Sequence, residues 1–341
     1  MLAFEPADMS AGLWWAPGAG LDDVQFRQCR NYIEHNVCNW MINANDPADS
    51  NYCLACRLNT MIPNLQQEGN LDYWHKIEAA KRHLLYSLYQ LKLPVISKKI
   101  DEVRGLSFSF GADPNTESTG VAGNEQKPFF TGHDQGVITI NIAEADEISR
   151  TRMREMMQEK YRTLLGHFRH EIGHYYWDFL VKDTAPILEE FRSLFGDESL
   201  DYAEAQKRHY QSGPPAGWQS THISAYASMH PWEDWAETWA HYLHMIDTLE
   251  TAHDFGFVIR PQNNQPFDNP AQARMLHTSP SQDEFRELVD DWVRLTLGIN
   301  AISRSMGLRD TYPFVLHDKA REKLHFVHRV IHGASMQNPP N

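Results

Sequence analysis

The sequence predicts an α+β protein that is mostly helical and contains a small sheet. Apolar residues recur at helical spacing in several long segments, whereas only residues 106–110 and 137–142 alternate between apolar and polar positions as strands do. With 341 residues and an apolar content of 42 %, the chain is large enough for a sizeable core, in one domain or in two.

The N-terminal part is predicted to be poor in regular structure. Residues 1–25 are rich in Gly, Pro and Trp, and we expect an irregular lead-in. Residues 26–62 contain the turn-prone stretch NANDPADSN and should form a small loop-rich module that needs a covalent or metal staple. The first helix is expected over 71–92, because apolar residues recur there at helical spacing until shortly before Pro94.

The rest of the chain is predicted to be helical apart from the two strands and three irregular stretches. We expect a loop over 111–136, a linker over the Asn- and Pro-rich residues 261–270, and a frayed tail, ASMQNPPN. One helix should begin at Pro231, because proline suits the first helical turn, and end near Leu249. The other helical segments are expected over 150–180, 183–215, 281–306 and 317–332.

The charge of the chain argues against two classes of partner. Lys and Arg number 31 and Asp and Glu number 45, so the formal net charge is −14. Nucleic acid and anionic membranes would both repel such a chain. The stretch MLAFEPADMSAGLWW lacks the basic start and apolar run of a signal peptide, and no apolar run approaches the ~20 residues of a transmembrane helix. We therefore expect a cytoplasmic protein.

All four cysteines, Cys29, Cys38, Cys53 and Cys56, lie in the predicted loop-rich module. In a reducing compartment such a cluster favours a metal site over disulfides. Two residues separate Cys53 from Cys56, so both thiolates can reach one ion, and Cys29 and Cys38 would complete a tetrahedral structural zinc site. The alternative is four reduced, buried thiols. We place the lead-in and the zinc module at residues 1–66, followed by one domain over 67–341.

A second metal-binding pattern lies in HFRHEIGHYYWDFL, residues 167–180, on a predicted helix. His170 and His174 are four residues apart, so both imidazoles lie on one helix face and can reach a single zinc ion. Glu171 projects beside them, where its carboxylate can take a proton from a water molecule that the ion activates and return it to a leaving amine. The HExxH pattern therefore predicts a catalytic zinc site.

A catalytic zinc site needs a third protein ligand and keeps one position open. The longer motif HExxHxxGxxH is excluded, because Trp177 and Leu180 occupy its Gly and third His positions. Residues 230–244, HPWEDWAETWAHYLH, place Glu233 and Glu237 four residues apart on one helix face. We assign Glu233 as the third ligand and Glu237 as the acceptor that orients a ligand imidazole. A plain exposed helix face is the alternative.

Four neighbouring residues have less specific signals. Asp178, one turn after the second histidine of the motif, is a further candidate acceptor for a ligand imidazole, with a solvated face as the equal alternative. Tyr226 and His230 lie just upstream of the predicted third ligand and are candidates for stabilising an oxyanion. Packing and helix capping are their alternatives. His167, one turn before the motif, is expected to pack or to support the site without binding the metal.

The chain resembles the bacterial zinc-binding metallopeptidases of the gluzincin type over nearly its whole length. The resemblance implies a metal-dependent peptidase in which His170, Glu171 and His174 match the catalytic motif. The spacing around Glu233 is similar to that of other short gluzincins, which favours Glu233 over Glu237 as the ligand. The resemblance is carried by VCNW (37–40), CLACRLN (53–59), IP (62–63), AKR (80–82), NIAEAD (141–146), YRTLLGHFRHEIGHYYW (161–177) and HPWEDWAETWAHYLH (230–244).

Two features depart from the pattern of that family. Its members often begin with a zinc ribbon built on CxxC pairs, and MLAFEPAD looks like the segment that follows such a ribbon, so we expect the ribbon to be absent here, either lost or trimmed. In addition, 58 residues separate His174 from Glu233, far more than in thermolysin-like enzymes. The acidic stretch Glu189–Glu204 within this insert is expected to roof the substrate site.

The motifs and the resemblance together predict a zincin-like domain that acts as a gluzincin-like zinc metallopeptidase on a peptide or protein substrate. Two Zn²⁺ ions are expected, one catalytic and one structural, and the strand 137–142 should bind an extended peptide by strand addition. The rival interpretation is a catalytically silent, zinc-stabilised protein-interaction module, although an intact Glu171 argues against it. A nucleic-acid binder is disfavoured by the net charge.

Overall fold

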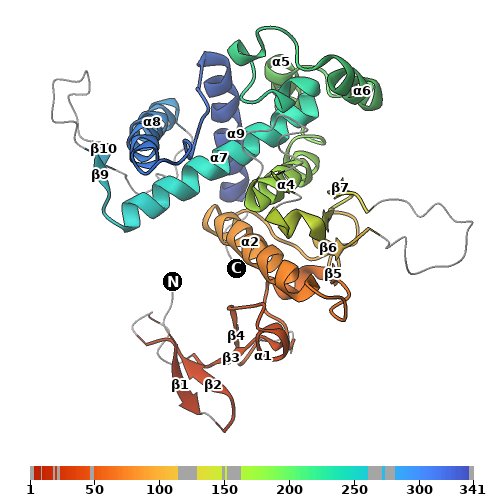
Figure 1. Ribbon diagram of the computed structural model, residues 1–341, viewed down its shortest axis with the longest axis vertical. Coiled ribbons are helices and arrows are strands. Elements are labelled where there is room, and N and C mark those ends of the chain that lie inside the picture. The colour runs from red at the N-terminus through yellow and green to blue at the C-terminus, as the bar shows by residue number, and fades with distance from the viewer. Residues whose placement is uncertain are drawn as a thin grey trace, which may run out of the picture. The chain divides into compact units, whose positions relative to one another are not determined.

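The computed structural model confirms a mostly helical α+β protein with small sheets (Figure 1). The structure describes residues 4–8, 10–17, 20, 24–46, 50–113, 129–147, 150–151, 163–259, 271–272 and 281–337. The chain divides into two compact units. The first contains Met1–Tyr86 and Val95–Thr151, and the second contains Ser87–Pro94 and Arg152–Asn341. No helix among the described residues is long and apolar enough to cross a membrane.

An antiparallel sheet of order β1-β2-β3-β4 begins the first unit, so the expectation of an irregular lead-in is wrong. The turn between the first two strands explains the error. The Asp8 carboxylate accepts hydrogen bonds from the backbone N–H groups of Ser10 and Ala11, and Gly12 has a φ of 65°. The bounds in this part are β1 Glu5–Asp8, β2 Leu13–Trp15, β3 Phe26–Gln28, α1 Arg30–His35, β4 Met41–Asn43 and the 3₁₀ helix η1 Cys56–Leu58.

The second sheet of this unit is mixed and has the order β5-β6-β8-β7. The strands expected over 106–110 and 137–142 are confirmed as β6 and β8, whereas β7 lies in the segment expected to be a loop. β8 pairs with β6 on one side and with β7 on the other, so the prediction that this strand receives a peptide is wrong. The bounds are β5 Asn59–Met61, β6 Ser107–Gly111, β7 Gly132–Asp134, β8 Val137–Asn141 and η2 Ile142–Ala145.

Helix α2, Asn70–Gln90, confirms the helix expected over 71–92. Its Lys81 amino group lies 5.5 Å from the ring centres of both Phe108 and Phe110 in β6, so this part of the helix covers the sheet. Arg82 donates a hydrogen bond to the carbonyl of Val37 at 2.5 Å. That bond ties α2 to the loop that carries the second cysteine.

The second unit is built from helices, and most of the expected ones are confirmed. The helix expected over 150–180 is not continuous, because Thr163 is extended and its hydroxyl caps a new helix by accepting from the N–H of Gly166 at 2.9 Å. Residues 152–162, the predicted linker 261–270 and the last residues of the tail lie outside the described residues. The bounds are α4 Leu164–Leu180, α5 Ala185–Phe195, α6 Tyr202–Ser212, η3 Trp218–Ser220, η4 Tyr226–Met229, α7 Pro231–Asp254, β9 Val258–Ile259, β10 Ala271–Gln272, α8 Gln282–Ser305 and α9 Asp318–Gln337.

Helix α7 packs against α4, α5, α8 and α9 and carries much of the core of the second unit (Figure 1). Its Trp235 and Trp239 are fully buried. The ring of Tyr176 in α4 stacks on Trp239 with the ring centres 5.0 Å apart. Aromatic burial of this size contributes strongly to helix packing, so α4 and α7 form a rigid pair.

The two helices cross closely at Gly173. A Cβ atom at this position would lie 3.1 Å from the Cα of Ala236 and 3.2 Å from the Cβ of Trp239. The indole N–H of Trp235 donates to the Gly173 carbonyl at 2.8 Å. Because glycine has no side chain, the histidine-bearing face of α4 comes close to the first turns of α7.

Candidate functional site

Two imidazoles and a carboxylate converge where α4 meets α7. Nε2 of His170 lies 3.2 Å from Nε2 of His174 and 2.9 Å from Oε2 of Glu233. Nε2 of His174 lies 3.5 Å from the same carboxylate oxygen. All three side chains are buried. Three possible metal ligands therefore point at one buried place.

The geometry and charge of this place fit a zinc ion. At zinc–ligand distances of about 2.0–2.1 Å, tetrahedral ligand atoms lie about 3.3 Å apart, close to the three measured separations. Within the described part of the chain, the ion pairs of Glu171, Glu233 and Glu237 are all with histidines. Three carboxylates thus gather without a lysine or arginine in their ion pairs, and a divalent cation would offset two of their three negative charges.

Glu237, one turn further along α7, contacts the other side of a possible ligand. Its Oε1 accepts a hydrogen bond from Nδ1 of His170 at 2.7 Å, and its Oε2 accepts one from the Ser224 hydroxyl at 2.6 Å. A proton on Nδ1 leaves the Nε2 lone pair of His170 for a metal. The contact therefore sets both the orientation and the tautomer of this imidazole.

The buried groups perturb one another's ionisation. Burial opposes the charged form of Glu233, but the charge and hydrogen bonds of His174 and His170 prevail and hold its pKa well below the ordinary value. Burial likewise opposes the charged form of His170, but its hydrogen bonds to Glu233 and Glu237 raise its pKa well above the ordinary value. The carboxylates thus draw positive charge to this place.

Glu171 is buried beside the convergence point and contacts His167. Its Oε1 lies 3.1 Å from Nε2 of His167. Burial by itself would raise the pKa of Glu171, but the hydrogen bond with His167 and the neighbouring imidazoles outweigh it and lower that pKa. The group is therefore an ionised carboxylate at neutral pH, the form in which it can accept a proton.

Tyr202, the first residue of α6, makes a contact that sequence reasoning missed. Its hydroxyl donates a hydrogen bond to Oε1 of Glu233 at 2.8 Å. Burial and the charge of Glu233 raise the pKa of Tyr202, so the hydroxyl keeps its proton. No local pattern joins two residues so far apart in the chain, and the long insert before Glu233 was the only available signal. Ser224 was missed for the same reason.

His230 lies at the start of α7. It is the N-cap of α7, where its Nδ1 accepts a hydrogen bond from the backbone N–H of Trp232 at 3.2 Å. Its Nε2 donates to the carbonyl of Leu200 at 3.1 Å. Both ring nitrogens are bound within the protein, which favours the helix-capping alternative, and the role of His230 in stabilising an oxyanion stays a prediction.

Two further predicted site residues lie in different surroundings. The ring centre of Tyr226 is 5.8 Å from that of His170, and its role as an oxyanion donor stays a prediction. Asp178 lies 3.4 Å from the amino group of Lys182 on a partly exposed helix face. This contact favours the alternative that Asp178 belongs to the solvated face of α4, and it gives no support to its predicted role as an acceptor for a ligand imidazole.

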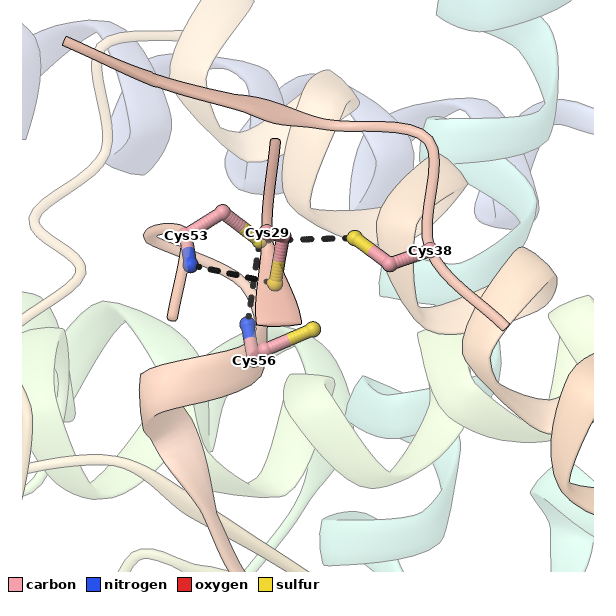
Figure 2. Close-up of side chains that lie close together, drawn as sticks. All are labelled: Cys29, Cys38, Cys53 and Cys56. Carbon is pink, nitrogen blue, oxygen red and sulfur yellow. Dashed lines mark hydrogen bonds between the residues drawn. The ribbon is translucent and has the colours of Figure 1, made fainter. Parts of the chain in front are cut away.

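The four cysteines come together in the first unit (Figure 2). Their sulfur atoms lie within 4.8 Å of one another, and the sulfurs of Cys38 and Cys53 are 3.6 Å apart. All four are buried and none forms a disulfide. Thiolates bound to one zinc ion at about 2.3 Å lie about 3.8 Å apart in a tetrahedron, so the cluster also fits zinc.

Backbone N–H groups point at these sulfurs (Figure 2). Trp40 donates to Cys38 at 3.4 Å, Cys53 to Cys29 at 3.4 Å, and Cys56 to Cys53 at 3.5 Å. Such bonds favour the thiolate form. The neighbouring thiols lower the pKa of Cys29 but raise the pKa of Cys56, because adjacent thiolates repel one another, and a bound cation would favour the thiolate form of all four.

Two family models match the chain. The family described as "Putative zinc-binding metallo-peptidase" matches residues 70–330, which include the convergence of His170, His174 and Glu233. A zinc-ribbon domain matches residues 1–67, which include all four cysteines. The expectation that the ribbon is absent is therefore wrong.

Relatives of similar length occur in mycobacteria. An uncharacterized protein of Mycobacterium bovis and uncharacterized proteins of two Mycobacterium tuberculosis strains are each 40 % identical to the chain over 312 residues, which is 91 % of this chain and 84 % of each relative. No solved structure is significantly similar to the chain. The domain boundary expected between residues 66 and 67 stays a prediction, because the two compact units divide the chain differently.

Proposed function

The chain belongs to the family of zinc-binding metallopeptidases, and from this premise we propose that it hydrolyses amide bonds in a peptide or protein substrate. The observation that carries the proposal is the buried convergence of His170, His174 and Glu233 beside the ionised carboxylate of Glu171. A metal site that only stabilised the fold would not need a buried base next to it.

Two sets of residues would hold zinc. His170, His174 and Glu233 would bind the catalytic ion, and the four cysteines would bind a structural one. When bound at the first set, zinc lowers the pKa of a water molecule and polarises the amide carbonyl. The four-thiolate set has no position for a water molecule, so its contribution is to folding.

Glu171 would move the protons. Its carboxylate accepts a proton as the water oxygen forms a bond to the carbonyl carbon, and it then delivers that proton to the amide nitrogen as the C–N bond breaks. His167, with Nε2 3.1 Å from Oε1 of Glu171, keeps this carboxylate in place and ionised. Glu171 thus both accepts and donates the transferred proton, so the reaction requires no second base.

Other residues would orient the site. Glu237 fixes the ring of His170 through Nδ1, and Ser224 fixes Glu237 in turn. Tyr226 is the candidate donor to the oxyanion, because its ring lies beside that of His170. Neither the orientation of His170 nor the donation to the oxyanion involves the leaving amine.

The decisive experiment compares Glu171→Gln with the wild type. We expect the variant to retain both zinc ions and its fold but to lose hydrolysis of a mixed peptide library, because an amide cannot accept the proton. Asp178→Asn is the matched control, since Asp178 lies on the same helix but pairs with Lys182 at the surface. It should hydrolyse at the wild-type rate.

The same experiment tests the rival interpretation. If the wild type binds zinc at both sites yet hydrolyses no peptide, or if Glu171→Gln hydrolyses as fast as the wild type, the peptidase proposal fails. A catalytically silent interaction module then becomes the better description of the chain.

A further inference from the structure

Helix α6 has no part in the chemistry proposed above, yet its first residue reaches the metal ligands. The helix lies in the long insert between His174 and Glu233. Its start is fixed by Asp201, whose side chain accepts a hydrogen bond from the backbone N–H of Glu204 at 3.0 Å. Tyr202 follows directly and is therefore held at a defined place.

The two carboxylate oxygens of Glu233 contact different groups, Tyr202 on one side and the two imidazoles on the other. Oε1 accepts the hydrogen bond of the Tyr202 hydroxyl at 2.8 Å. Oε2 lies 2.9 Å from Nε2 of His170 and 3.5 Å from Nε2 of His174. Without the phenol, the carboxylate could rotate or present either oxygen to the imidazoles. With it, one orientation is selected.

Two aromatic side chains at the start of α7 also contact the ring of Tyr202. Its centre lies 5.3 Å from that of His230 and 6.0 Å from that of Trp232, both in edge-on contact. His230 also binds the carbonyl of Leu200, two residues before the tyrosine. The N-terminus of α7 thus anchors the segment that carries the phenol.

We infer that Tyr202 is a positioning residue of the metal centre, which orients Glu233 so that Oε2 faces His170 and His174. The inference rests on the proposed function, because it takes these three residues as the zinc ligands. Groups that hydrogen-bond a ligating carboxylate contribute to metal affinity nearly as the ligands do, and their loss typically weakens binding by roughly 10- to 100-fold. The insert would then belong to the metal site as well as to any substrate contact.

The test is the variant Tyr202→Phe, which removes the hydroxyl and keeps the ring. Zinc affinity is measured by competition with a chromophoric chelator, and we expect it to fall by roughly 10- to 100-fold at one of two sites. Tyr210→Phe is the matched control, because Tyr210 lies on the same helix and is 54 % exposed. It should bind zinc as the wild type does.

A second readout separates positioning from a general loss of stability. The wild type and Tyr202→Phe are each loaded with Co²⁺, and their visible spectra are recorded. From each spectrum we subtract that of the corresponding protein with the additional substitution His170→Ala, which leaves only the signal of the histidine site. The difference spectrum should change in Tyr202→Phe, because the orientation of a ligand carboxylate alters the field at the ion. Unfolding in urea is followed in parallel.

The outcomes distinguish this inference from the proposed function. If Tyr202→Phe keeps the wild-type zinc affinity, or loses stability in urea without a change in the cobalt difference spectrum, the positioning role is overturned. Glu233→Ala serves as the reference. If that variant still binds two zinc ions with wild-type affinity, the proposed ligand set itself is wrong, and the inference falls with it.

Discussion

Nδ1 of His170 lies 2.7 Å from Oε1 of Glu237, while Nε2 of the same ring lies 2.9 Å from Oε2 of Glu233. One imidazole is therefore held between two carboxylates from successive turns of α7. Because the two contacts use different ring nitrogens, the two glutamates have different tasks. Oε2 of Glu233 also lies near Nε2 of His174, whereas Oε2 of Glu237 accepts a hydrogen bond from the Ser224 hydroxyl.

The division of tasks predicts different effects of removing each glutamate. Glu233→Ala should empty the site, because two imidazoles alone hold zinc weakly. Glu237→Ala should weaken zinc affinity by roughly 10- to 100-fold, as loss of a group that orients a ligand does. Zinc content and chelator competition measure both effects. If Glu237→Ala empties the site while Glu233→Ala leaves it full, the assignment of the two residues is reversed.

The close crossing of α4 and α7 predicts that a side chain at Gly173 is destabilising. In Gly173→Ala the new Cβ would lie 3.1 Å from the Cα of Ala236, so the backbone of α7 would have to move away by a few tenths of an ångström. We expect the free energy of unfolding to fall by about 1–3 kcal/mol, and zinc affinity at the histidine site to fall with it.

The control for this prediction is Gly333→Ala in α9, where a Cβ would meet no atom within 4 Å. That substitution should raise the free energy of unfolding by about 0.5–1 kcal/mol, because alanine loses less entropy in a helix. Urea unfolding of the two variants measures both values. If Gly173→Ala raises the free energy of unfolding as much as Gly333→Ala does, the close crossing of α4 and α7 does not limit the size of this side chain.

The buried His241 predicts a loss of stability in acid. Burial lowers its pKa to about 4, and its Nδ1 lies 2.7 Å from the hydroxyl of Tyr312. An unfolded histidine has a pKa of about 6.5, so protons favour the unfolded chain below that pH. The contribution of His241 is complete above about pH 6.5 and is lost towards pH 4, by roughly 3 kcal/mol.

The measurement is urea unfolding of the wild type and of His241→Gln from pH 7.5 to pH 4. The difference between the two unfolding free energies should fall by roughly 3 kcal/mol over this range, since only the wild type carries the group. Titrations shared by both proteins cancel in that difference. A difference that does not vary with pH would show that His241 is not held neutral by the fold.

The two proposed zinc sites predict a separable response to chelation. A chelator of moderate strength should abolish hydrolysis before it unfolds the protein, because a closed four-thiolate site contributes folding free energy and the histidine site contributes reactivity. Hydrolysis, zinc content and circular dichroism are followed along one titration. Loss of activity and of fold at the same chelator concentration, under every condition, would contradict this separation.

Local spacing in the sequence determined a large part of this protein. Helix periodicity places His170 and His174 on one face, and likewise Glu233 and Glu237, whatever the rest of the chain does. Two residues between Cys53 and Cys56 bring both sulfurs to one point. The long helices follow from apolar spacing alone, and α7 begins at Pro231 as expected.

The tertiary structure decided every contact between distant segments. The hydrogen bond of Tyr202 to Glu233 and that of Ser224 to Glu237 depend on the path of the insert, which no local pattern encodes. The sequence position of His230 made it a candidate for stabilising an oxyanion, but in the fold its ring nitrogens bind the backbone N–H of Trp232 and the carbonyl of Leu200. Periodicity fixes which side chains share a face, whereas the fold of the whole chain determines which partners they meet, because side-chain hydrogen bonds form only at contact distance.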